Sequence, residues 1–221
     1  MRKTAGKFAA MIAFGLLMAS SGVITATAAP TDLPPMEDQI DAQDLAEGTL
    51  ILKSSGDSPY AVPEIDNTGL LTPTKEDKKV VRAFTIGDTA LNALCALPGA
   101  TNRVIDKYPS KKHGTISFHC GNTSFGYKHI KARRPESQWR VQMGDSGSWT
   151  AYMRYLQRSA LKSPNIVRNQ PGEKACYSTP VKVYRVVNGS PRYWKTINPS
   201  VVISKNNKKI ITSIPSTRSA C

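Results

Sequence analysis

The chain has 221 residues, with 30 lysines and arginines against 16 aspartates and glutamates, and a formal net charge of +14. This excess of cations favours polyanionic partners: nucleic acid, a wall polymer or an anionic membrane surface. No Walker loop, G-x-S-x-G or H-E-x-x-H motif is present, which disfavours phosphate-loop NTPases, hydrolases with a serine nucleophile elbow and zinc proteases.

Residues 1–28 are predicted to be a secretory signal peptide. Three cations precede an apolar run over residues 8–24, and Ala26-Thr27-Ala28 matches a small-residue cleavage site. Serines and a glycine within the run disfavour the alternative, an uncleaved signal anchor. No later stretch is apolar for long enough to cross a bilayer. We therefore expect a secreted protein, extracellular or associated with the cell envelope, with no transmembrane segment after signal removal.

Residues 29–75 are predicted to be an acidic lead that is mostly extended or disordered. Nine of the 16 acidic residues lie in 31–66 against one lysine, and the stretch is rich in proline, serine and threonine. One interpretation is a solvated spacer. The other is a pro-segment whose acids cover the basic body until it is removed.

Residues 76–221 are predicted to form one basic α+β domain, in which N-terminal helices pack on a C-terminal antiparallel β-meander. Apolar residues at intervals of three and four predict one or two short helices over 76–95. Residues 96–114 contain two prolines and two glycines and are predicted to be loop, with room for a helical turn over 103–108.

Alternation over residues 115–120 predicts a half-buried strand with His119 on the face opposite Phe118. The chain then passes through a glycine-containing turn into a helix expected over 123–134. A polar pocket is expected where strand and helix meet, although an exposed strand position for His119 fits the pattern equally well.

A further helix is expected after the glycines at 144 and 147, with Ser146 or Ser148 as its N-cap. Its aromatic and aliphatic stripe is predicted to be core, with Arg154 off that stripe. Beyond a polar loop ending at Lys174, the chain is predicted to be strand to its end, with Asn188-Gly189 as a hairpin turn.

Four cysteines lie beyond the signal peptide, and an even number in an exported chain predicts two disulfides. Three pairings are possible, and the sequence does not choose among them. No C-x-x-C spacing occurs, which disfavours a zinc site or a redox pair, and pairing disfavours a cysteine protease. The four are Cys95, Cys120, Cys176 and Cys221.

The stretch 120–134 most resembles a functional site, because it concentrates a histidine, four cations and two aromatics. Histidine is a ready proton acceptor at neutral pH, and neighbouring cations attract phosphate. The alternative is an amphipathic basic helix, with Tyr127 and Ile130 in the core and one partly buried histidine.

The motif Gly126-Tyr-Lys-His-Ile130, followed by a helix and by strands ending in Ile210-Ile-Thr-Ser-Ile-Pro215, resembles the barnase, EndoU, colicin D and RelE-like superfamily of metal-independent ribonucleases. The similarity is greatest to the toxin modules of bacterial polymorphic and contact-dependent toxins. It covers roughly residues 76–215. Many such modules carry a second histidine where this chain has Arg134, which weakens a two-histidine mechanism unless His119 or a cation takes that role.

The resemblance implies an endoribonuclease that needs no metal and no cofactor, with RNA as substrate and an immunity or inhibitor protein as a further partner. His129 would be the general base or acid, and Lys128, Arg133 and Arg134 would bind or stabilise the phosphate. Thr212 or Ser213 would contact the scissile phosphate. The expected substrate-binding residues are His119, Tyr127 and Lys131.

Outside residues 31–66 only seven acidic residues remain, so a two-metal carboxylate site is hard to assemble. The rival interpretation is a non-catalytic secreted protein that binds nucleic acid, wall polymer or an anionic surface through its cations, with Tyr127, Trp139 or Trp194 stacking. A hydrolase of another type is the second rival.

Overall fold

The computed structural model describes residues 45–62, 87–218 and 221. The predicted signal peptide, most of the acidic lead and the first part of the predicted helix over 76–95 lie outside the described residues. Within the described part of the chain, no helix is long and apolar enough to cross a membrane.

A six-stranded mixed sheet forms the larger half of the fold, in the order β3-β4-β10-β9-β6-β5. All neighbouring strands are antiparallel except β4 and β10, which are parallel. The strands are β3 (Val104–Ser110), β4 (Gly114–His119), β5 (Ile166–Gln170), β6 (Lys174–Ser178), β9 (Ser200–Ser204) and β10 (Lys209–Ile214).

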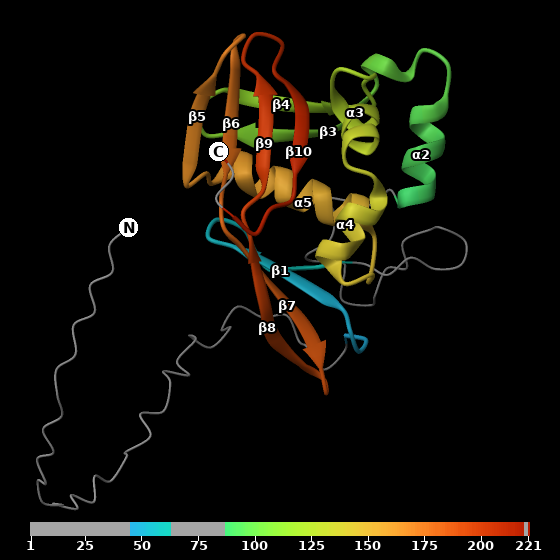
Figure 1. Ribbon diagram of the computed structural model, residues 1–221, viewed down its shortest axis with the longest axis vertical. Coiled ribbons are helices and arrows are strands. Elements are labelled where there is room, and N and C mark those ends of the chain that lie inside the picture. The colour runs from blue at the N-terminus through green and yellow to red at the C-terminus, as the bar shows by residue number, and fades with distance from the viewer. Residues whose placement is uncertain (1–44, 63–86, 219–220) are drawn as a thin grey trace, which may run out of the picture. The chain divides into compact units, whose positions relative to one another are not determined.

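Helix α5 (Trp149–Lys162) packs against β3, β6 and β9 on one face of this sheet, as Figure 1 shows. As expected, Ser148 caps it: the Ser148 hydroxyl accepts a hydrogen bond from the Ala151 backbone amide. Alternate residues of the strands, such as Phe118 and Ile210, are completely buried on this face. We call the opposite face of the same sheet the outer face. Helix α5 does not cover it.

Arg154 departs from its predicted place off the apolar stripe, since only 1% of the residue is exposed. Its Nη1 atom lies 3.4 Å from Oδ2 of Asp106 in β3, and its Nε donates to the backbone carbonyl of Thr150. The helical periodicity of the sequence predicts which residues form the apolar stripe, but it cannot show that Asp106 of another element meets Arg154.

A second, four-stranded sheet has the order β2-β1-β7-β8. Its strands are β1 (Leu50–Ser54), β2 (Tyr60–Ala61), β7 (Val181–Val187) and β8 (Ser190–Ile197). Asn188 and Gly189 form the β7–β8 turn as expected, both with positive φ (52° and 69°).

Strand β1 corrects the prediction of a mostly disordered lead. It pairs with β2 on one side and β7 on the other, and Leu50, Ile51 and Leu52 are at most 1% exposed. Just beyond it, Asp57 forms an ion pair with Lys162 of α5. The prediction missed β1 because acids and prolines outnumber its short aliphatic run in the composition of residues 29–75. The folded unit therefore begins before residue 76, and removal of residues 29–75 as a pro-segment would take an inner strand out of the sheet.

The remaining helices lie mostly in the middle of the chain rather than at its N-terminus, so the predicted order of helices and then strands is wrong, although the α+β class is correct. They are α2 (Asp88–Ala96), the 3₁₀ turn η2 (Ala100–Asn102), α3 (Gly126–Arg133) and α4 (Glu136–Met143).

The predicted single meander is also wrong, because β7–β8 and β9–β10 belong to different sheets. The expected helical turn over 103–108 is strand β3, and the expected polar loop before Lys174 contains β5. In both places a strand with few apolar residues is held by pairing to a neighbour, β4 or β6. Periodicity within a segment does not report such a partner.

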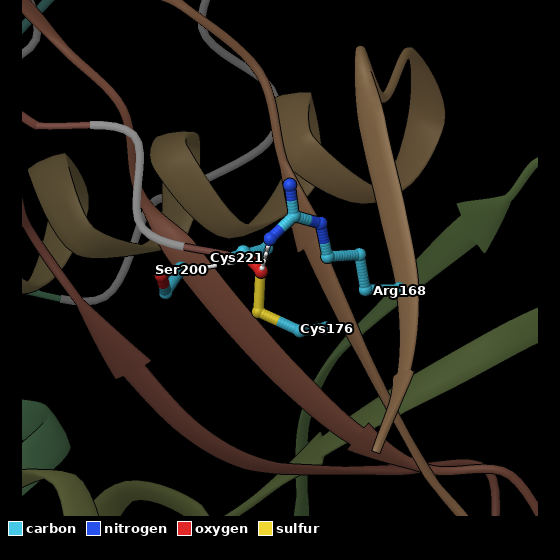
Figure 2. The surroundings of a disulfide bond; sticks show 4 residues. All are labelled: Arg168, Cys176, Ser200 and Cys221. Carbon is cyan, nitrogen blue, oxygen red and sulfur yellow. Dashed lines mark hydrogen bonds between the residues drawn. A yellow bond between two sulfur atoms is a disulfide. The ribbon is translucent and has the colours of Figure 1, made fainter.

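Two disulfides are present, as predicted. Cys95–Cys120 joins α2 to the end of β4, and Cys176–Cys221 joins β6 to the last residue. Figure 2 shows the second bridge, where Arg168 donates to the backbone carbonyl oxygen of Cys221 at 2.7 Å. The Cys176–Cys221 disulfide, which closes the longer of the two loops, thus joins the last residue to the outer face.

Candidate functional site

A β-bulge determines which side chains of β10 reach the outer face. Ile210 pairs with Ile203, but Thr212 pairs with Val202, so Ile211 is an extra residue in the strand. Ile210 and Ser213 are therefore both buried on the α5 side. Lys209 and Thr212, also three residues apart, both lie on the outer face and are half-buried. Bulges commonly redirect side chains beside functional sites.

His119 of β4 lies on this outer face, opposite Phe118 as expected. The neighbouring register pairs Ser117 with Lys209, which places β4 directly beside β10. Only 7% of His119 is exposed, and its Nδ1 atom has no hydrogen-bond partner. Burial, and then the charge of Lys209, lower the pKa of His119, weakly opposed by the backbone of Ser117.

A tight turn carries the chain from β4 into α3. Gly121 and Gly126 have φ of 67° and 77°. A Cβ atom on Gly126 would lie 2.5 Å from the carbonyl oxygen of His119, and one on Gly121 would lie 1.8 Å from that of Phe125. Only glycine fits both positions, since each combines a left-handed backbone with a backbone contact. The turn folds α3 back so that it packs on β4 and β10 (Figure 1).

His129 is half-buried in the second turn of α3. Its Nδ1 atom lies 2.5 Å from the backbone carbonyl oxygen of Thr123. Because a carbonyl can only accept, Nδ1 carries the proton, and Nε2 is then the acceptor nitrogen of the neutral ring. A general base at this position would therefore accept its proton at Nε2.

The cations of α3 are all close to His129 in sequence, but they differ in their exposure to solvent. Lys128 is half-buried, whereas Lys131 and Arg133 are exposed. Lys131 donates to the side-chain oxygen of Asn92 in α2 at 2.7 Å, which directs it away from β10. Arg134 is half-buried, and its Nη1 donates to the Arg133 carbonyl.

Two residues predicted to touch substrate are structural instead. Tyr127 is 2% exposed, its hydroxyl donates to Asn92, and its ring stacks on Trp149 at 5.8 Å. Burial, with a smaller contribution from Asp88, raises the pKa of Tyr127. The core interpretation of this face of the helix is therefore correct. Ser213 is 1% exposed and accepts a hydrogen bond from Gln157 of α5.

Phe125 and Lys209 belong to the site but were not predicted. The half-buried Phe125 ring lies edge-on to His119, with centroids 6.1 Å apart, and Lys209 Nζ lies 5.0 Å from the Phe125 centroid. The only sequence signal is an aromatic between Ser124 and the glycine that opens the helix. Nothing in the sequence places Lys209 beside it.

Among the described residues, no three histidine, cysteine, aspartate or glutamate side chains form a group that would hold a metal ion. No protein-family model matches this chain, and no curated protein matches it either.

Proposed function

We propose that this protein is a secreted, toxin-type endoribonuclease that cleaves RNA without a metal, by attack of a ribose 2′-hydroxyl on the adjacent phosphodiester. The observation that carries the proposal is the position of α3. This helix, with His129 and its cations, packs on the two strands whose outer face carries His119, Lys209 and Thr212. The predicted signal peptide and the two disulfides support export.

His129 is assigned as the general base. Its Nε2 takes the proton of the 2′-hydroxyl, while the bond from Nδ1 to the Thr123 carbonyl holds the ring in the required tautomer. The 2′-oxygen then attacks phosphorus, and the bond to the 5′-oxygen breaks. The leaving oxygen takes a proton from solvent, which gives a 2′,3′-cyclic phosphate and a 5′-hydroxyl.

The added charge on the phosphorane needs donors that are already in place. We assign Lys128, Arg133 and Arg134 to stabilise this charge. The Thr212 hydroxyl is assigned to donate a hydrogen bond to a non-bridging phosphate oxygen. Ser213 and Tyr127 receive no catalytic role, because both are buried with partners of their own.

The test is cleavage of total RNA in EDTA by the purified, oxidised protein and by two histidine variants. His129→Ala should abolish cleavage. His113→Ala should not, since His113 lies at the β3–β4 turn against Tyr177, away from α3. The proposal is supported if the parent and His113→Ala produce cyclic phosphate ends and His129→Ala does not. Equal cleavage by parent and His129→Ala would overturn it.

The second candidate is a polyanion-binding protein without turnover. One cluster favours it: Trp194 of β8 is 37% exposed, with Arg185 and Lys195 over its ring at 4.5 and 3.8 Å. Trp139 and Tyr127, which were also expected to stack on a ligand, are buried. Intact RNA with parent and variants alike, together with salt-sensitive RNA binding, would favour this candidate.

A further inference from the structure

Three side chains from separate parts of the chain meet on the outer face beside α3, and we call them the Phe125 subsite. Phe125 precedes α3, His119 ends β4 and Lys209 begins β10. The Phe125 ring is half-exposed and lies outside the buried hydrophobic cluster of the core. It contacts the His119 ring edge-on and carries the Lys209 ammonium 5.0 Å from its centroid.

The three side chains of the Phe125 subsite differ in how far they are exposed to a ligand. His119 is more than nine-tenths buried and its Nδ1 atom is fully covered by the protein, so its ring supports Phe125 and does not itself reach a ligand. Among the described residues Lys209 forms no ion pair, and its charge rests against an aromatic ring instead. The group therefore offers a half-exposed aromatic ring and a half-buried cation side by side on the surface, with the buried His119 ring in edge contact with Phe125.

We propose that the Phe125 subsite binds one unpaired nucleobase of the RNA: the base stacks on Phe125, the buried His119 ring holds the Phe125 ring in place, and Lys209 contacts the adjoining phosphate. The proposal rests on the ribonuclease function and adds its substrate class, single-stranded RNA. Bases within a duplex are covered on both faces and paired at their edges, so they cannot enter such a site. Aromatic stacking accepts any base, with the cation holding the backbone.

The probe is a fluorescent 2′-O-methyl RNA 12-mer, single-stranded or in a duplex, which lacks the 2′-hydroxyl and so reports binding without cleavage. Phe125→Leu should weaken single-strand binding by about 5- to 150-fold, the range for loss of one stacked base, and should change duplex binding by less than about twofold. Phe125→Tyr, which keeps the ring, should bind nearly as the parent. Tyr193→Leu, which removes an exposed aromatic from the other sheet, is the matched control.

Equal single-strand affinity for the parent and a folded Phe125→Leu overturns the subsite, even if the protein cleaves RNA. Weakened binding by Phe125→Leu supports the subsite, even if the protein does not cleave RNA. Should Phe125→Leu fail to fold, the parent decides the question by photocrosslinking to a single strand containing 5-bromouracil. A crosslink on the peptide that contains Phe125 supports the proposal, and crosslinks found elsewhere alone overturn it.

Discussion

Lys209 and Thr212 stand three residues apart in β10, yet both lie on the sheet face opposite α5. In a regular strand residues an odd number apart point to opposite faces. The extra residue, Ile211, restores them to one face and sends Ser213 into the core. The bulge thereby places one of two adjacent hydroxyl residues, Thr212, on the outer face and the other, Ser213, in the core.

This division predicts opposite phenotypes for two neighbouring substitutions. Thr212→Val should lower RNA cleavage by about 10- to 100-fold with little loss of stability, because it removes one phosphate donor. Ser213→Ala should leave Gln157 Nε2 without its partner and cost about 1–3 kcal/mol of unfolding free energy. Cleavage rates and urea unfolding of both variants measure this. A catalytic loss confined to Ser213→Ala would reverse the assignment.

The turn into α3 should tolerate no side chain at Gly126. Gly126→Ala combines a positive φ with a Cβ atom 2.5 Å from a backbone oxygen, and we expect a loss of about 3 kcal/mol. Gly189→Ala is the matched control, since its φ is +69° but nothing lies within 4 Å, and about 1 kcal/mol is expected. Urea unfolding compares them, and similar losses for the two would mean that the turn can shift.

Stability should fall as the pH drops below about 6.5, the ordinary pKa of histidine. His119 and His113 both have lowered pKa values, chiefly through burial. The unfolded chain therefore takes up these protons first, which favours unfolding as the pH falls from 6.5 toward each folded pKa. In urea unfolding from pH 8 to 5, His119→Asn and His113→Asn should each show a shallower dependence than the parent. An unchanged slope in both variants would contradict this.

The two disulfides should differ in their effect on activity. Loops of 25 and 45 residues predict comparable stabilisation, on the order of 3–4 kcal/mol each. Removing Cys95–Cys120 should also loosen the turn before α3 and abolish cleavage. Cys176→Ser with Cys221→Ser should keep cleavage within a few-fold under folding conditions. Melting curves and RNA assays of the two double variants check this, and an equal effect on cleavage would count against it.

The aliphatic run of β1 should be essential to folding. Leu52→Ala, at a fully buried position of an inner strand, should cost about 2–5 kcal/mol. A chain beginning at Thr74 lacks β1 and should not fold, whereas one beginning at Ala29 should. Circular dichroism and limited proteolysis distinguish these cases. A stable chain from Thr74 would restore the view that this segment is a removable lead.

Patterns completed within a few residues could be predicted from the sequence. The alternation of β4, the Ser148 cap, the Asn188-Gly189 turn and the presence of two disulfides all follow from local stereochemistry or from cysteine number. The placement of Tyr127 and Ile130 in the core was foreseen as the structural alternative for α3. The assignment of His129 to RNA chemistry remains a prediction.

Tertiary structure alone decided the remainder. β1, β3 and β5 are held by pairing with strands far away in the sequence, and Arg154 is buried because Asp106 meets it from another element. The sequence does not reveal that β10 inserts beside β4 with a bulge, which brings Lys209 to Phe125 and His119. A chain encodes its local conformations residue by residue, but which faces and edges meet depends on the packing of the whole sheet.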